Sequence, residues 1–207
     1  QVARLESRLW KERSLPIHDI RPAVRRVRER MAAIEAEIEE RGEVARAPGQ
    51  LALGNVHLAL GEADAAVSHL ELAWSEGYAP RETAWALGRA VADLYQRGLS
   101  SLAAIADPEL RAAERERLER GHGDRARDLL RRARGCNAAS GAFIESLLAL
   151  VEGRTEEGLR LARSSFSEAP WQYEAKLLEG DLLVARAREL KGGEETARLC
   201  AEAEACY

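Results

Sequence analysis

The hydrophobic pattern of residues 47–80 predicts two short helices that pack against each other. In the second half of this stretch, apolar side chains recur every three or four residues, as at Ala66 and Leu70, which is the period of one helix face. Gly61 separates the two halves, and Gly54 lies within the first. Because Gly54 and Ala66 carry almost no side chain, the two backbones can approach closely where the helices cross, with leucines filling the seam. The stretch therefore predicts an antiparallel helical hairpin.

The same pattern recurs along the chain. A Leu-Gly pair at residues 87–88 repeats the pair at residues 53–54 after 34 residues. Residues 121–133 reproduce the spacing of small and apolar positions found at residues 61–73, which predicts the second helix of a third hairpin. Two further units follow, a fourth that ends with residues 153–170 and a fifth that opens at residues 171–187. The recurrence predicts about five hairpins over three-quarters of the chain.

Cap and turn residues mark several helix boundaries. Asp107 and Ser140 can each cap the start of a helix, and Gly153 can end the second of these helices. The chain is expected to turn again at residues 192–193. Residues 81–106 contain no strong break, so they form either one long helix or two.

The first residues of the chain are predicted to be a connector. Residues 1–20 mix apolar and charged side chains and break at Pro16, since the residue before a proline disfavours the helical region. Trp10 is expected to pack on its own helix or on an upstream domain, with an exposed docking point as the alternative. The chain begins with Gln1 rather than Met, so we expect it to be a segment of a longer protein.

An amphipathic helix follows the connector. From Pro22, apolar residues recur at steps of three and four until Gly42, which predicts one helix with an apolar stripe. The first helix of the first hairpin, at residues 49–60, can cover this stripe. Residues 1–46 are therefore predicted to be a linker and an N-terminal packing helix that closes one end of the stack.

Composition supports an all-α protein. Apolar residues make up 46% of the chain and charged residues 32%, which is neither the composition of a disordered segment nor that of a membrane-embedded one. No run of β-branched residues alternates at period two, so strands have little support. The three cysteines form no close C-x-x-C pair, and there is no signal peptide or membrane-length apolar run. We expect a reducing, cytoplasmic location and no membrane segment.

The sequence offers no candidate catalytic or metal site. Its four histidines lack the H-E-x-x-H spacing and have no nearby cysteine partner. Cys200 and Cys206 are six residues apart, which places them on different sides of a helix. No nucleotide-binding glycine motif or nucleophile elbow occurs. We therefore predict no enzyme activity, no cofactor and no metal within this chain.

Two arginine-rich segments raise the alternative of nucleic-acid binding. They lie at residues 21–30 and 124–134. Both contain or adjoin acidic residues, and aromatic side chains that could stack on bases are not interleaved with the arginines. The net charge is −4, from 35 acidic and 31 basic residues mixed along the same helices, which is typical of solvated faces. Binding to nucleic acid is thus a disfavoured alternative.

The first hairpin resembles a tetratricopeptide repeat. The family pattern of a Leu-Gly pair followed by small and large apolar positions is matched by Leu53, Gly54, Gly61, Ala66, Leu70 and Ala73. Gln50 stands where the family has Trp, His57 where it has Tyr, and Pro80 comes two places late. The resemblance implies a tetratricopeptide-like helical-hairpin solenoid over residues 47–207.

In this family, the first helices of successive hairpins line a concave groove that takes an extended peptide or a partner helix. If Gly54, Gly88 and Gly180 are equivalent positions, the resemblance implies a mainly apolar partner-binding groove. Its residues are Leu51, Asn55, Leu58, Trp85, Arg89, Phe143, Leu147, Leu177 and Asp181. Core packing is the alternative role for Trp85 and Phe143. The carboxylate clamp of chaperone-binding members is not expected, because Leu51 stands in place of its lysine.

The order of these segments along the chain also resembles the tetratricopeptide region that follows the kinase domain in some multidomain bacterial serine/threonine protein kinases. That resemblance implies a regulatory or docking region that binds a protein or peptide, with an upstream kinase domain as a further partner. A stand-alone adaptor or scaffold is the alternative within the same class. A nucleic-acid-binding helical repeat is the alternative of another class.

Overall fold

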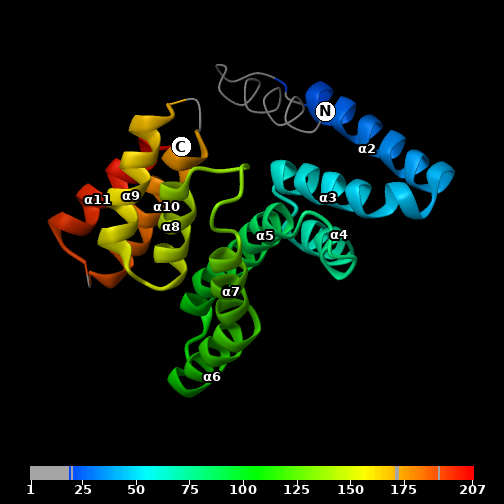
Figure 1. Ribbon diagram of the computed structural model, residues 1–207. Helices are drawn as coiled ribbons and strands as arrows, with labels where there is room; N and C mark the ends of the chain where they lie inside the picture. The colour runs from blue at the N-terminus through cyan, green and yellow to red at the C-terminus, as the bar shows by residue number, and fades with distance from the viewer. Residues whose placement is uncertain (1–18, 20, 171–172, 191) are drawn as a thin grey trace.

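The computed structural model describes residues 19, 21–170, 173–190 and 192–207, and no strand occurs within these ranges. The protein is all-helical there, as the sequence predicts (Figure 1). The helices are α2 (Arg21–Arg41), α3 (Glu43–Leu60), α4 (Ala63–Ser75), α5 (Pro80–Ser101), η1 (Leu102–Ala104), α6 (Pro108–Leu118), η2 (Glu119–Gly123), α7 (Asp124–Arg132), α8 (Gly141–Val151), α9 (Thr155–Glu168), α10 (Glu174–Glu189) and α11 (Glu194–Glu204). The connector predicted for residues 1–20, with Trp10, lies outside the described residues except for Asp19.

Helix α2 is the predicted amphipathic helix. It buries Ala23, Val27 and Met31 in a small cluster with two residues of α3, Leu53 and Val56. It contacts α3 and covers the first hairpin at the N-terminal end of the stack, as Figure 1 shows. The packing helix is therefore confirmed.

Helices α3 and α4 form the predicted hairpin. Gly61 ends α3 with a φ of 80°, a left-handed conformation that glycine adopts without steric cost. Close approach at the crossing is also confirmed, because a Cβ atom on Gly54 would lie 2.4 Å from Cγ of Leu70. The prediction was wrong about where α3 begins. The helix starts at Glu43 rather than residue 49 and contains Pro48 near its N-terminal end.

Adding one methyl group at the α3–α4 crossing should destabilise the protein. The side chain of Leu70 is fully buried, so it has no free space into which to move away from a new Cβ atom. We expect Gly54→Ala to lower the free energy of unfolding by about 1–3 kcal/mol, as overpacking does in well-packed cores. Urea denaturation followed by circular dichroism measures this change.

Gly121→Ala is the matched control for that substitution. Gly121 is exposed, and a Cβ atom there would meet nothing within 4 Å. The control should leave stability unchanged or raise it by up to about 1 kcal/mol, because alanine restricts the unfolded chain more than glycine does. Equal effects of the two substitutions would contradict the close packing at Gly54.

The sequence left open whether residues 81–106 form one helix or two, and the structure has one long helix, α5, which η1 extends to Ala104. The hairpin that α5 forms differs from the predicted repeat. The helix predicted to belong to a third unit is α7, and it packs against α5 itself: a Cβ atom on Gly88 would lie 3.1 Å from Cδ2 of Leu130. The intervening residues lengthen α5 and add α6 instead of forming a separate hairpin. The described helices that follow α2 therefore pair as four hairpins, α3–α4, α5–α7, α8–α9 and α10–α11, rather than about five.

The extension makes a helical arm that projects from the other helices (Figure 1). The arm contains the C-terminal end of α5, then η1 and α6, and it returns through the π-helical turn η2 to α7. Asp107 caps α6 as predicted, with its side chain accepting a hydrogen bond from the Glu109 amide at 2.8 Å. Inside the arm, Glu119 accepts hydrogen bonds from the Tyr95 hydroxyl and from Arg127. Burial and the bond to Glu119 raise the pKa of Tyr95 to about 12.

The last two hairpins follow the predicted boundaries. Ser140 caps α8 by accepting a hydrogen bond from the Phe143 amide, and Gly153 has a positive φ of 71° in the turn to α9. The chain turns between α10 and α11 at Gly192 and Gly193. The first helices of the hairpins, α3, α5, α8 and α10, contact one another in that order. They form one layer of the molecule, and their partners α4, α7, α9 and α11 pack on it.

Two histidines stack between α3 and α4. The rings of His57 and His69 are 5.0 Å apart between centroids and nearly parallel. Nδ1 of His57 lies 2.7 Å from a carboxylate oxygen of Glu62, and Nδ1 of His69 lies 2.7 Å from the side-chain oxygen of Gln50. Burial and the neighbouring His57 lower the pKa of His69, against a smaller opposing effect of Glu35.

This histidine pair should make the protein less stable in mild acid. Because the fold favours the neutral form of His69, the unfolded chain takes up a proton near pH 6.5 more readily than the folded chain does. The contribution of His69 to stability is complete above that pH and declines as the pH falls below it. We expect the urea concentration at the unfolding midpoint to decrease when the pH is lowered from 7.5 to 5.5. The decrease should be smaller for His69→Gln. Equal declines in the two proteins would exclude His69 as the cause.

Candidate binding groove between α5, α8 and α10

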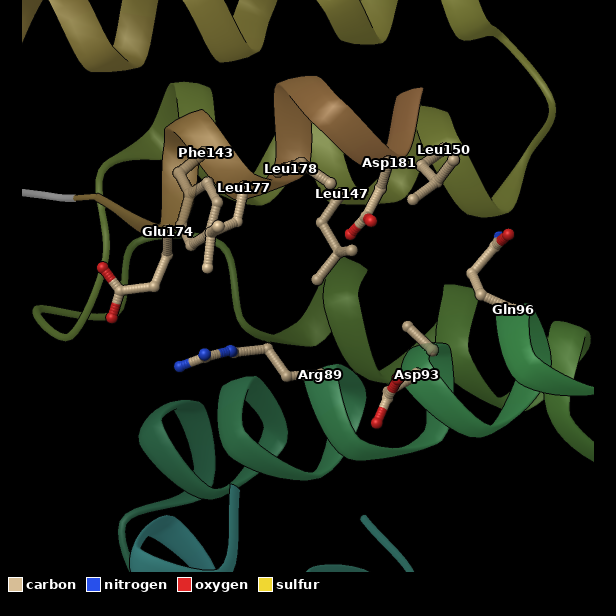
Figure 2. A pocket seen from close by; sticks show the side chains of 11 residues that line it. Arg89, Asp93, Gln96, Phe143, Leu147, Leu150, Glu174, Leu177, Leu178 and Asp181 are labelled. Carbon is tan, nitrogen blue, oxygen red and sulfur yellow. The ribbon is translucent and has the colours of Figure 1, made fainter. Parts of the chain in front are cut away.

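An open pocket of about 200 Å³ lies between α5, α8 and α10. Figure 2 shows these three helices around it, with α5 on one side and with α8 and α10 on the other. We call it the α5–α8–α10 groove. Its lining residues are Arg89, Ala92, Asp93, Gln96, Phe143, Leu147, Leu150, Glu174, Leu177, Leu178 and Asp181. All three helices belong to the layer of first helices.

The floor of the groove is apolar. Leu147 and Leu177 are partly exposed, one on α8 and one on α10, and the more buried Leu150 and Leu178 lie next to them. Phe143 is only 4% exposed and contributes an edge of the floor. The leucines lie over a packed core and are partly exposed. Covering them with another apolar group removes apolar area from water, which favours binding.

Charged side chains surround this floor. The guanidinium group of Arg89 lies 5.4 Å from the centre of the Trp85 ring, a cation–π contact. Among the described residues, neither Arg89 nor Glu174 has an ion-pair partner, and Figure 2 shows both side chains at the same end of the groove. Two ionic groups are thus available to a ligand at this end.

The opposite end of the groove is acidic. Asp181 accepts a hydrogen bond of 2.7 Å from the hydroxyl of Tyr207. Its pKa is raised, mainly because the surrounding protein reduces its hydration, and also because of the negative charge of Asp93. The Tyr207 bond and Arg188 oppose this rise. Asp93 itself pairs with Arg97 on α5 at 2.5 Å.

Five of the nine residues that the sequence predicts as partner-binding line this one groove. They are Arg89, Phe143, Leu147, Leu177 and Asp181. The structure thus brings together side chains from three hairpins that are up to 92 residues apart in the sequence.

The other four predicted residues lie elsewhere. Trp85 is only 4% exposed and packs edge-on against Phe143, with the ring centres 5.5 Å apart, so its role is in the core. Leu51, Asn55 and Leu58 are partly buried on α3 and do not line the groove. Both leucines pack against the main core, which limits the area that they can offer to a ligand.

Sequence reasoning missed six lining residues, namely Ala92, Asp93, Gln96, Leu150, Glu174 and Leu178. Each lies at a helical spacing of one, three or four residues from a predicted residue or from another missed one. Extending the predicted faces by one turn along α5, α8 and α10 would have found them.

The arginine-rich segment at residues 124–134, which contains α7, is not a free basic patch. Each of its five arginines forms an ion pair: Arg125 with Glu71, Arg127 with Glu119 and Asp124, Arg131 with Glu152, Arg132 with Asp128, and Arg134 with Glu145. These pairs reduce the positive potential that would attract phosphates.

Within the described ranges, no group of three or more His, Cys, Asp and Glu side chains is placed to hold a metal ion. In that same part of the chain, no helix combines the length and the apolar character needed to cross a membrane. Comparison with protein-family models, with curated proteins and with solved structures found no match to the chain. The groove is therefore the feature from which we infer a function.

Proposed function

We propose that this chain is a protein–protein interaction module that binds a segment of a partner protein in the α5–α8–α10 groove. The observation that carries the proposal is an apolar floor, open to solvent, with the charged side chains of Arg89 and Glu174 at its edge. Such a surface combines burial of apolar area with polar groups that fix a ligand's orientation.

The size of the groove favours a side chain of a partner over a free small molecule. Sites for small molecules and cofactors usually enclose about 300–1,000 Å³, and this open pocket has about 200 Å³. A cavity of about 150 Å³ is known to hold a benzene ring. One large apolar side chain of a partner therefore fits, with the rest of its segment lying along the helices.

The fold supports a tetratricopeptide-like solenoid as the framework of this module. Helical hairpins are stacked in two layers, and small residues occupy the crossings, as with Gly54 against Leu70 and Gly88 against Leu130. The groove is formed by first helices of successive hairpins, which is the surface that the resemblance assigns to binding. The α5–α7 hairpin departs from the pattern through its long arm.

We also propose, from the resemblance in sequence order, that the module is the regulatory or docking region of a cytoplasmic bacterial serine/threonine kinase, and we assign no catalytic step to it. The mass and peptide map of the native protein, isolated with an antibody to this segment, test this link. A mass well above 22.8 kDa together with upstream kinase peptides would support it. A native protein that begins near Gln1 would contradict it and favour a stand-alone adaptor.

Binding of peptides tests the proposed function itself. Random peptides are selected by display on the full chain, and their dissociation constants are measured by fluorescence anisotropy. We expect Leu147→Arg to weaken binding at least tenfold, because a charged side chain replaces the apolar floor, while circular dichroism shows an intact fold. The control is Leu110→Arg, at a leucine that is 62% exposed on the arm, which should leave affinity unchanged. Selected peptides that bind both variants equally well would refute a site in the groove.

A further inference from the structure

The charges around the groove indicate what kind of segment it binds. Of its lining residues, one is basic, Arg89, and three are acidic, Asp93, Glu174 and Asp181. Arg97 neutralises Asp93. No lining residue at the Asp181 end of the groove is basic, although Arg188, outside the lining, favours the ionised form of Asp181.

Asp181 is the acidic lining residue that lies beside the apolar floor without an ion pair in the described part of the chain. Among the described residues no ion pair to it occurs, and it accepts a hydrogen bond from the Tyr207 hydroxyl, a neutral donor. Figure 2 shows its carboxylate turned into the space between α10 and α5. The charge of Asp93 on the opposite helix acts against the ionised form of Asp181. A cation placed here would be attracted to the carboxylate of Asp181 and would favour its ionised form.

The apolar floor lies directly beside this carboxylate. Asp181 comes one helical turn after Leu177 on α10, a rise of about 5–6 Å, and both residues line the same pocket. A ligand that covers the floor with an apolar side chain can therefore reach Asp181 with a long basic side chain from a position two to four residues away.

We propose that the occupant of the groove is a protein segment that places a large apolar side chain over Leu147 and Leu177 and a Lys or Arg side chain against Asp181. This inference rests on the proposed function and adds the chemistry of the partner. Arg89 and Glu174 at the other end are then available to the peptide groups or side chains that follow the apolar residue.

The peptides selected by display also test this chemistry. Their residue content is examined, and substitutions in the chain are combined with substitutions in the peptide. Peptides selected on the full chain should be enriched in Lys or Arg two to four residues from a large apolar residue. Asp181→Asn should weaken their binding about tenfold, since a hydrogen bond to a charged group is lost while the Tyr207 hydroxyl can still donate to the amide oxygen. Changing the basic residue of the peptide to Gln should remove the difference between the wild-type chain and Asp181→Asn.

Glu109→Gln is the control, because it removes an exposed negative charge on the arm and should not change affinity. Four results would overturn the inference. Peptides that lose affinity with Leu147→Arg but not with Asp181→Asn, or that carry acidic residues in place of basic ones, would leave the proposed function standing with a different ligand. Binding insensitive to both substitutions would refute the inference and the proposed function together. A concentration-dependent dimer that excludes the peptides would identify a second copy as the occupant.

Discussion

Trp85→Ala should lower the free energy of unfolding by about 3–5 kcal/mol, the usual cost of truncating a large aromatic side chain in a core. Trp85 is 4% exposed and contacts Phe143 edge-on at 5.5 Å, so its removal leaves a cavity between α5 and α8. The substitution also removes the ring under Arg89. Urea denaturation measures this loss of stability. It is followed by far-ultraviolet circular dichroism, which does not depend on tryptophan fluorescence.

Two companion variants separate packing at Trp85 from binding. Trp85→Phe should recover much of the lost stability, because it keeps a ring in the cavity. Arg89→Ala, one turn further along α5, should change stability by at most about 1 kcal/mol, since it removes a cation–π contact at a partly exposed site. If Trp85→Ala were as stable as Arg89→Ala, the core position of Trp85 would be wrong. For the same reason, Arg89 and Leu147 are better probes of binding than Trp85.

Leu130→Ala should cost about 2–5 kcal/mol, the range for a fully buried leucine. Leu130 is 0% exposed and packs on the backbone of Gly88. The variant therefore tests the pairing of α7 with α5, which is where the structure departs most from the predicted repeat. Chemical denaturation at two temperatures gives the change in free energy and shows whether unfolding stays cooperative.

The control for this variant is Leu110→Ala on the arm. Leu110 is 62% exposed, so its truncation should change stability by no more than about 0.5 kcal/mol. Adding Gly88→Ala to Leu130→Ala should be tolerated better than Gly88→Ala alone, because the smaller side chain leaves room for the new methyl group. Additive effects of the two substitutions would contradict direct contact between Gly88 and Leu130.

Much of the fold could be predicted because local signals agree with it. The stripe of α2, the caps at Asp107 and Ser140, and the turn at Gly61 each depend on residues close together in the sequence. Such features need only helical periodicity and cap chemistry.

The pairing of α5 with α7 could not be predicted in the same way. The spacing of small residues in α7 is that of a repeat's second helix, but spacing alone does not say which first helix it packs on. The insertion between them lengthens α5 and adds α6, and both remain helical by local criteria. Contacts between helices, such as that between Gly88 and Leu130, distinguish a long hairpin from two short ones.

The groove was predictable in part for a related reason. The faces of α5, α8 and α10 could be read from helical spacing, and Arg89, Leu147 and Asp181 follow from it. The same spacing places Trp85 on the groove face, yet the ring turns into the core against Phe143. How far a side chain is covered depends on the neighbouring hairpin, which the sequence of one helix does not show.

The most direct test of the account is a methyl NMR spectrum of the full chain, with labelled leucine and valine, titrated with the tightest selected peptide. We expect the largest shift changes at Leu147, Leu150, Leu177 and Leu178, with small changes at Leu72 and Leu110, which are exposed elsewhere. Shift changes centred on α2 and α3, with the methyl groups around Asp181 unmoved, would contradict a binding site in the α5–α8–α10 groove.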